Sequence, residues 1–222
     1  MSYLDETVAY WSRGYDAENV DAPAFRFYGR ILKPFGPREG KFLDFGCGAG
    51  AGLRFFLSKE YDAYGVDISA TDLATARDRD PEHADRYLQI DPIPKPDDVW
   101  FGGNFDVIMS VQVLYLMGAD DMQTRLKSLH AQLKPDGLFY ATMMGSKSWW
   151  YSVSEPYEHG MRRVELPESH GGGATGVVFT ESEEQLLERF SMFEPLHVGF
   201  YSEKFRSDEG PGFHYTFVGR PR

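Results

Sequence analysis

The 222-residue sequence predicts an α/β fold in which helices cover both faces of a mostly parallel sheet. Short apolar runs alternate with helical segments between residues 41 and 144, as in successive βαβ units. A glycine-rich turn follows the first apolar run directly. The last two apolar runs are joined by a loop alone, which permits an antiparallel hairpin. We therefore expect five parallel βα units followed by a terminal hairpin.

The elements are expected in the following order. Two helical pieces lie within residues 5–34, and Pro34 to Gly40 ends the second. Strands are expected at 41–45, 63–68, 86–90, 105–111 and 138–144, and helices at 53–57, 71–77 and 120–133. Residues 134–137 are expected to form a turn. A helix over 181–190 precedes strands at 196–205 and 213–219. Four residues are candidate N-caps: Ser69, Thr71, Thr180 and Ser182.

Composition and charge limit the class of protein. The formal net charge is −11 and no run of Lys and Arg occurs, so we expect no nucleic-acid partner. Cys47 is the one cysteine, which excludes a disulfide within the chain and a Cys-based metal site, and no metal is expected. The N-terminus does not resemble a signal peptide, and no apolar run is long enough to span a membrane. These features predict a cytoplasmic protein without a membrane partner.

The motif with the clearest chemistry runs from Phe42 to Gly52, at the junction of the first strand and its helix. Its glycines fit the G-x-G-x-x-G/A pattern of dinucleotide sites. Asp44 stands two positions before Gly46 and favours S-adenosylmethionine (SAM) instead. A carboxylate there repels a pyrophosphate, whereas SAM presents an α-ammonium and a sulfonium. The alternative is that Asp44 only caps the glycine turn.

A second carboxylate, Asp67, ends the second strand about 20 residues beyond the glycine turn. A carboxylate at this position accepts hydrogen bonds from the ribose hydroxyls of a nucleotide-like ligand, whether NAD or SAM. The alternative is that Asp67 caps the following helix. Together, the turn and Asp67 indicate a ligand with an adenosine moiety.

Four segments resemble motifs of the class I SAM-dependent methyltransferases, of the small-molecule type. They are Asp44–Gly50, Val66–Ile68, Phe105–Ile108 and Leu133–Gly137, and they occur in the family's order. The resemblance implies a Rossmann-like, seven-stranded, mostly parallel sheet with an antiparallel last strand and helices on both faces. It also implies SAM as the cofactor and methyl transfer as the activity.

The resemblance assigns further residues to the donor site. Asp91 resembles the acceptor of the adenine amino group, and because Pro92 has no N–H, either Ile93 supplies the backbone contact or the adenine pocket is shifted. The segment at the end of the fourth strand resembles the one that runs beneath the methionine moiety of SAM; the alternative is that its residues only pack at the strand end. These residues are Ser110, Val111 and Gln112. An N-terminal aromatic cluster closes over the donor, or forms a hydrophobic staple for the first helix: Tyr10, Trp11 and Tyr15. The remaining predicted contacts are Phe45, Gly46, Cys47, Gly48 and Ile68.

The predicted single domain has four parts. Residues 1–39 form an N-terminal helical cap, residues 40–145 a SAM-binding core, residues 146–179 a partly mobile substrate lid, and residues 180–222 a terminal helix and β-hairpin. Two lid histidines, His159 and His170, are the candidate general bases, although each also fits a structural or surface role. Arg162 and Arg163 are candidates for binding an anionic group of the acceptor.

The function predicted from these features is methyl transfer from SAM to an oxygen or nitrogen of a small molecule, with a saccharide or secondary metabolite suggested by analogy. Two alternatives stay open at this point. One is an NAD(P)-dependent oxidoreductase on a Rossmann sheet, and the other is a SAM-binding module without turnover. The sequence does not specify the acceptor or the oligomeric state.

Overall fold

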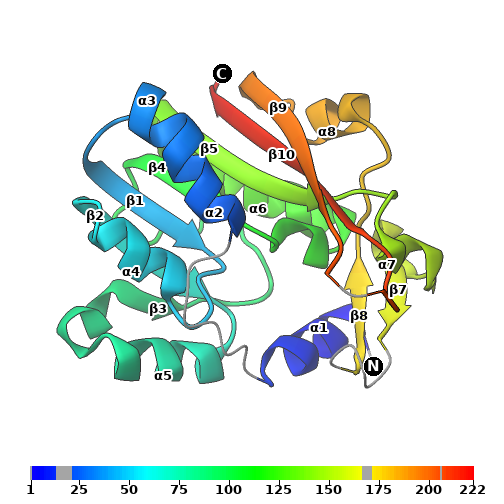
Figure 1. The fold of residues 1–222 in the computed structure, drawn as a ribbon. Coiled ribbons are helices and arrows are strands. Elements are labelled where there is room, and N and C mark those ends of the chain that lie inside the picture. Colours follow the sequence, from blue (N-terminus) through cyan, green and yellow to red (C-terminus); the bar gives the residue numbers. More distant parts are fainter. Residues whose placement is uncertain (1, 14–21, 167–171, 206) are drawn as a thin grey trace.

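A central sheet of seven strands, in the order β3-β2-β1-β4-β5-β10-β9, organises the molecule (Figure 1). The computed structural model describes residues 2–13, 22–166, 172–205 and 207–222. Neighbours among the first five strands are parallel, and β10 is antiparallel to both β5 and β9. The fold class predicted from the sequence is confirmed. The strands are β1 (Gly40–Phe45), β2 (Tyr61–Asp67), β3 (Tyr87–Gln89), β4 (Phe105–Ser110), β5 (Leu133–Met144), β9 (Phe193–Glu203) and β10 (Gly212–Pro221).

Helices cover both faces of the sheet. One apolar cluster joins α2 (Ala22–Phe27), α4 (Ala51–Leu57) and α5 (Ala70–Arg79) to one face. The other cluster joins α6 (Ala119–Gln132) and α8 (Glu183–Arg189) to the opposite face. Because the central strands are buried on both sides, they carry continuous apolar runs instead of an alternating pattern. Short helical turns complete these layers: η2 (Pro81–Arg86) and η3 (Leu114–Leu116).

The N-terminal region forms two helical pieces, as predicted. Ser2 caps α1 (Tyr3–Trp11) through a capping box with Asp5. The second piece runs from α2 through the π-helical turn η1 (Tyr28–Leu32) into α3 (Lys33–Phe35). Pro34 occupies the first turn of α3, where its missing N–H is tolerated, and the helix ends one residue later.

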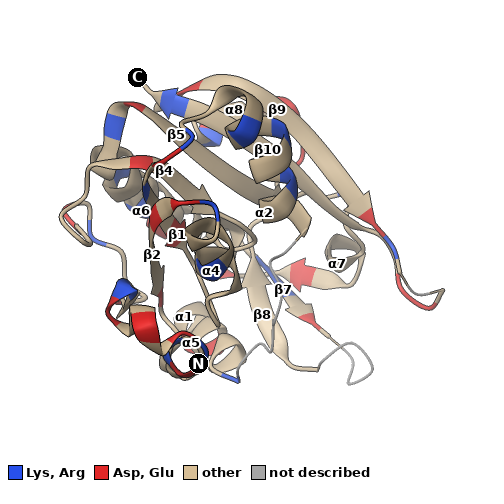
Figure 2. Cartoon of the chain, turned by 60° about the vertical axis from the view of Figure 1, so that its left-hand side comes forward, with Lys and Arg blue, Asp and Glu red and all other residues tan. Residues whose placement is uncertain are grey.

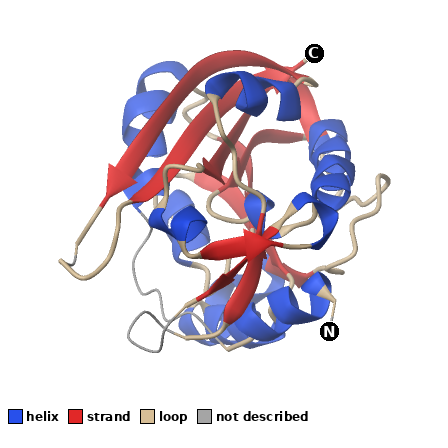
Figure 3. Ribbon diagram, turned by 90° about the vertical axis from the view of Figure 1, so that its right-hand side faces the viewer, coloured by secondary structure: helices blue, strands red, loops and turns tan. Residues whose placement is uncertain are grey.

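The described residues between 146 and 179 include a small antiparallel sheet beside the main one (Figure 3). It follows α7 (Trp149–Ser152) and consists of β6 (Ser154–Pro156), β7 (Arg162–Glu165) and β8 (Ala174–Val177), with η4 (Glu158–Gly160) in between. Helix α1 packs against β8 (Figure 1). The described part of this segment is therefore regular secondary structure, and its role as a substrate lid stays a prediction.

The turn predicted at residues 134–137 is wrong. Strand β5 begins at Leu133, and its register with β4 shifts so that residues 134–137 form an irregular insertion within the strand. Asp106 holds this insertion, because its carboxylate accepts hydrogen bonds from Lys134 Nζ at 2.7 Å and from the backbone N–H of Lys41 at 2.8 Å. Two predicted caps are confirmed: Ser69 caps α5 and Ser182 caps α8.

Charged side chains are dispersed over the chain. Figure 2 shows Lys and Arg interspersed with Asp and Glu rather than gathered on one element. No helix among the described residues is long and apolar enough to cross a membrane. The absence of a nucleic-acid partner stays a prediction.

Candidate cofactor and acceptor site

The glycine turn is attached to the end of β2. The backbone N–H groups of Gly46 and Cys47 both donate to the carbonyl of Val66, at 2.8 and 3.1 Å. Gly46 has φ +82°, and a Cβ on it would lie 2.1 Å from a methyl group of Val113. Only glycine fits this position, because both the left-handed backbone and the close approach exclude a side chain.

Asp67 joins the turn to the following helix. One carboxylate oxygen accepts the N–H of Gly48 and the other accepts the N–H of Ser69, both at 2.8 Å. Burial raises the pKa of Asp67, and these two backbone donors oppose the shift. A carboxylate has about four lone-pair sites, so each oxygen keeps capacity for another donor. The helix-end interaction and the predicted ribose contact are therefore compatible.

Open space lies beside Gly48. A Cβ built on this residue meets no atom within 4 Å, although its backbone is left-handed with φ +48°. The space is therefore next to the carboxylate of Asp67. This arrangement suits a ligand that approaches the backbone closely while its hydroxyl groups reach Asp67.

The two glycines should respond differently to the same substitution. We expect Gly46→Ala to lower the free energy of unfolding by about 2 kcal/mol or more, from the left-handed backbone and the clash with Val113. We expect Gly48→Ala to cost about 1 kcal/mol, yet to weaken binding of the demethylated donor S-adenosylhomocysteine (SAH) about tenfold by filling the open space. Urea denaturation and calorimetry measure the two effects. Equal stability losses in the two variants would contradict the assignment.

Asp44 lies buried below the turn, with 5% of its surface exposed. Its carboxylate packs against the first turn of α4, where a Cβ on Gly52 would come within 2.3 Å of Oδ2. Both interpretations of Asp44, as a cap and as a partner of the donor's ammonium group, are consistent with this position. Phe45 is buried against Trp100, so only its backbone faces the turn.

Cys47 is buried in the turn, and its sulfur packs close to Gly65. Burial raises the pKa of its thiol well above the ordinary value. A protonated, buried thiol is a poor nucleophile, so Cys47 is a packing residue whose backbone belongs to the turn.

Asp91 begins a loop that lies on α6. Its side chain is exposed and accepts the N–H of Ile93 at 2.9 Å, so this donor is already engaged within the loop. Its carbonyl accepts a hydrogen bond from Arg125 of α6 at 3.0 Å. Asp91 is therefore held by its backbone, while its carboxylate remains accessible for the predicted adenine contact.

The segment after β4 combines buried polar atoms with a strained backbone. Ser110 is fully buried, and its hydroxyl has no hydrogen-bond partner among the described residues. Val111 is half-buried. Gln112 has φ +60°, its N–H donates to Thr142 Oγ1 at 2.8 Å, and its side-chain amide donates to Tyr201 Oη at 3.2 Å. Non-glycine residues in this conformation are often found at functional sites.

The end of α1 lies beside the carboxyl end of β2. Ser69 Oγ donates to the carbonyl of Trp11 at 3.4 Å, and Tyr10 packs edge-to-face on Trp11. The indole N–H of Trp11 is buried and has no hydrogen-bond partner in the described part of the chain. Ile68, next to Asp67, is half-buried. These positions place Tyr10 and Trp11 of the predicted aromatic cluster next to the Asp67 region.

Comparisons with known proteins bear on this geometry. A family model described as a methyltransferase domain matches residues 43–139, which include the glycine turn, Asp67, Asp91 and the segment after β4. Residues 43–139 are therefore similar to a methyltransferase domain. A solved SAM-dependent methyltransferase from Anabaena variabilis superposes with a TM-score of 0.71 at 21% identity, covering 100% of this chain and 96% of the other.

Part of this chain is similar to two curated relatives. The cyclopropane-fatty-acyl-phospholipid synthase of Escherichia coli K12 is 29% identical over 148 residues, which is 65% of this chain and 36% of the relative. The malonyl-[acyl-carrier protein] O-methyltransferase of Enterobacter lignolyticus is 30% identical over 113 residues, 50% of this chain and 41% of the relative. The chain thus spans well under half the length of either relative.

Of the two candidate general bases, the structure describes only His159. His159 is exposed, has a left-handed backbone, and packs its ring 5.2 Å from that of Tyr3. Tyr3 in turn donates a short hydrogen bond to Asp121 near the start of α6. His170, like the aromatic Tyr15, lies outside the described residues. A base role for either histidine stays a prediction.

Both lid arginines are engaged with protein groups. Arg162 donates to the hydroxyl and carbonyl of Ser154, and Arg163 pairs with Glu6 and Glu165. These contacts tie the small sheet together and fix it to α1. The prediction that they are available for an anionic acceptor group is not supported.

One buried histidine of the methyltransferase fold was missed by the sequence analysis. His214 is 7% exposed, and burial lowers its pKa from 6.5 to about 4. Its Nε2 lies 3.4 Å from Tyr115 Oη, and its ring stacks on Tyr201. In the sequence it is one of several polar residues of its strand, with Thr216 and Arg220, and nothing marks it as different from a solvent-facing position.

His214 should make the protein sensitive to mild acid. Because its pKa is lower in the folded than in the unfolded chain, the unfolded chain binds more protons below about pH 6.5. Stability is therefore retained above that pH and lost as the pH falls towards 4. Between pH 7 and pH 5 we expect this residue to remove about 2 kcal/mol from the free energy of unfolding. Urea titrations measure the loss, and His214→Phe should reduce it by that amount; an unchanged pH slope in the variant would contradict the prediction.

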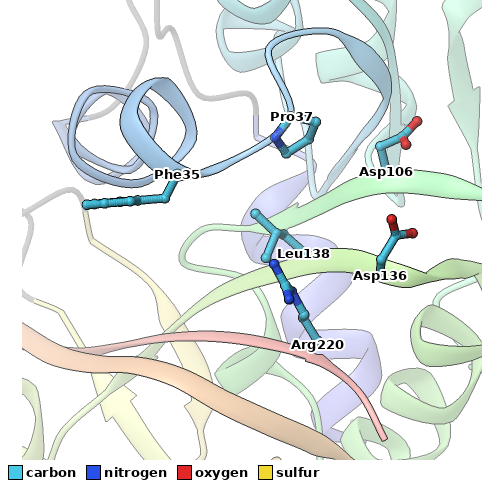
Figure 4. Close-up of a pocket in the computed structure, with 6 residues that line it drawn as sticks. All are labelled: Phe35, Pro37, Asp106, Asp136, Leu138 and Arg220. Atoms are coloured by element: carbon cyan, nitrogen blue, oxygen red, sulfur yellow. The ribbon is translucent and has the colours of Figure 1, made fainter.

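A small surface cavity lies elsewhere on the molecule. Figure 4 shows the residues that line it. They include Asp106, from the start of β4, and Asp136, from the 134–137 insertion. This is the amino-terminal edge of the parallel strands, opposite the glycine turn, and ligands of such sheets bind at the carboxyl edge. No group of three or more potential metal ligands occurs among the described residues. The cavity is therefore separate from the candidate site.

Proposed function

We propose that this chain binds SAM across the carboxyl ends of β1 and β2 and transfers its methyl group to an oxygen or nitrogen of a small molecule. The observation that carries the proposal is the carboxylate of Asp67, which fixes the glycine turn through Gly48 while retaining lone pairs for a ribose. The open space at Gly48 supports a close approach of the donor. Buried polar atoms of Trp11 and Ser110, without partners in the described chain, supply further hydrogen-bonding capacity nearby.

Bound SAM supplies a methyl group on a sulfonium, so that the carbon–sulfur bond breaks with its electron pair going to a neutral thioether while an acceptor lone pair forms the new bond. The residues of the chain position the two reactants, and effective molarity from such positioning contributes several kcal/mol in general. Asp67 holds the ribose end, Asp91 the adenine end and Gln112 the segment beneath the methionine moiety. The acceptor's proton passes to water or to a base, for which His159 and His170 are the candidates.

The relatives support a small acceptor. The name of the Enterobacter protein gives malonyl-[acyl-carrier protein] as the acceptor and oxygen as the methylated atom. Since the chain covers 41% of that protein, the acceptor class is inferred only as a small oxygen- or nitrogen-bearing group. Binding of such an acceptor does not require a basic protein surface, which agrees with the net charge of −11.

Calorimetric titration with SAM, SAH and NADH tests the proposal. We expect micromolar binding of SAM and SAH and no binding of NADH, because Asp44 disfavours a pyrophosphate. NADH binding without SAM binding would favour the oxidoreductase alternative. Donor binding without methyl transfer to any member of a panel of hydroxyl, carboxyl and amine compounds would favour a binding module without turnover.

A further inference from the structure

Polar side chains meet at the carboxyl edge of the sheet, one strand away from the donor site. Gln112, which follows β4, reaches across β5, because its N–H binds Thr142 and its amide binds Tyr201 of β9. His214 of β10 pairs in register with Tyr201 and with Met144, the last residue of β5. Since β10 is antiparallel, it begins at the edge where β4 and β5 end. Gln112, Tyr201 and His214 therefore form one cluster at the edge that carries the donor site.

The imidazole of His214 is held firmly in this cluster. Its ring lies nearly parallel to that of Tyr201, with centroids 5.0 Å apart and an interplanar angle of 12°. Its Nε2 faces the hydroxyl of Tyr115 at 3.4 Å. Its Nδ1 is buried and has no hydrogen-bond partner among the described residues. An unpartnered buried nitrogen is costly, and in a native protein it calls for an explanation, of which a bound molecule is one.

The contact with Tyr115 indicates which nitrogen carries the proton. A phenol is the better donor and an imidazole nitrogen the better acceptor, which favours the tautomer in which Tyr115 donates to Nε2 and the ring hydrogen resides on Nδ1. Burial keeps the ring uncharged at neutral pH. The cluster therefore offers an uncharged hydrogen-bond donor.

We propose that the methyl acceptor is an uncharged, oxygen-bearing small molecule, and that one of its oxygens accepts a hydrogen bond from Nδ1–H of His214. This inference rests on the proposed function and specifies its acceptor side. His214 binds and orients the acceptor and is not its base, because a base is most effective when its pKa lies near the working pH. Tyr201 and Gln112 fix the ring and the floor of the subsite.

Three variants separate the role of Nδ1 from that of the ring. His214→Phe keeps an aromatic ring without nitrogens, and His214→Asn retains an amide donor close to the position of Nδ1. His130→Phe is the matched control, because His130 also has a buried nitrogen without a described partner but packs on Phe193 from α6. SAH affinity is measured for each by calorimetry. Benzamide, benzoate and benzylamine are the probes, added to the SAH complex of protein labelled with ¹⁵N-histidine.

We expect the ¹⁵N spectrum of the wild type to show a protonated Nδ1 and a bare Nε2 for His214, and benzamide to shift the Nδ1 signal more than the charged probes do. Benzamide binding should weaken roughly fivefold to tenfold in His214→Phe, recover partly in His214→Asn and stay unchanged in His130→Phe. SAH affinity should stay within twofold in all three variants.

The outcomes distinguish a failure of the proposed SAM-dependent function from a failure of the inferred acceptor contact. If the wild type fails to bind SAH, the proposed function itself is wrong. If SAH binds but Nδ1 is unprotonated, or benzamide leaves the His214 signals unchanged, or benzoate shifts them more strongly, the acceptor inference is wrong and the proposed function stands. Should His214→Phe fail to fold, the wild-type spectrum and His214→Asn still decide the question.

Discussion

Replacing Asp67 with alanine is expected to weaken SAH binding at least about 100-fold. The ribose would lose charge-assisted hydrogen bonds, each of which contributes on the order of 1.5–3 kcal/mol. The substitution also frees the N–H groups of Gly48 and Ser69, which both donate to this carboxylate at 2.8 Å. The glycine turn thereby loses its connection to α5, so binding suffers from disorder of the turn as well as from the missing contact. Calorimetric titration with SAH measures the loss.

Asp62→Ala is the matched control for this experiment. Asp62 lies on the same strand, and its half-exposed side chain pairs with Arg86 at the surface. Exposed ion pairs contribute little, so SAH affinity and stability should stay close to those of the wild type. A folded Asp67→Ala protein that binds SAH within threefold of the wild type would remove the central support for the proposed donor site.

Replacing Asp98 with alanine is expected to destabilise the protein by about 3–5 kcal/mol, because it leaves the charge of Arg125 buried without its partner. Arg125 is 1% exposed, its Nη1 lies 2.6 Å from the carboxylate of Asp98, and its guanidinium stacks over Phe45 and Trp100. Burial already lowers the pKa of Arg125. Its other hydrogen bond, to the carbonyl of Asp91, does not neutralise the charge. Urea denaturation measures the change.

The double variant Asp98→Ala, Arg125→Met checks the cause. Methionine fills the buried volume without a charge, so the double variant should regain most of the stability lost in Asp98→Ala. SAH affinity should nonetheless decrease, since Arg125 also holds the backbone of Asp91. A double variant no more stable than Asp98→Ala would show that the buried charge is not the source of the loss.

The contrast between local and long-range information is clear in α6. The spacing of Met122, Leu126 and Leu129 predicts its apolar side, and all three are buried. The same helix also buries a polar row that the sequence does not distinguish from a solvated face: Arg125, Ser128 and Gln132. Ser128 donates to the carbonyl of Asp98, and Gln132 accepts the N–H of Trp100. This row holds the loop that begins at Asp91, and its partners lie about 30 residues away in the chain.

The sequence by itself determined the order of the main strands and helices and predicted the donor-side residues, because those signals are local: a period of alternation, a glycine turn and a carboxylate at a strand end. Only the tertiary structure decided the surroundings of His214. His214 meets Tyr115 and Tyr201 because β10 inserts antiparallel between β5 and β9. It is buried by those distant partners, and burial is what changes its chemistry. Hydrogen-bond partners and burial depend on contacts across about 100 residues, which no local pattern encodes.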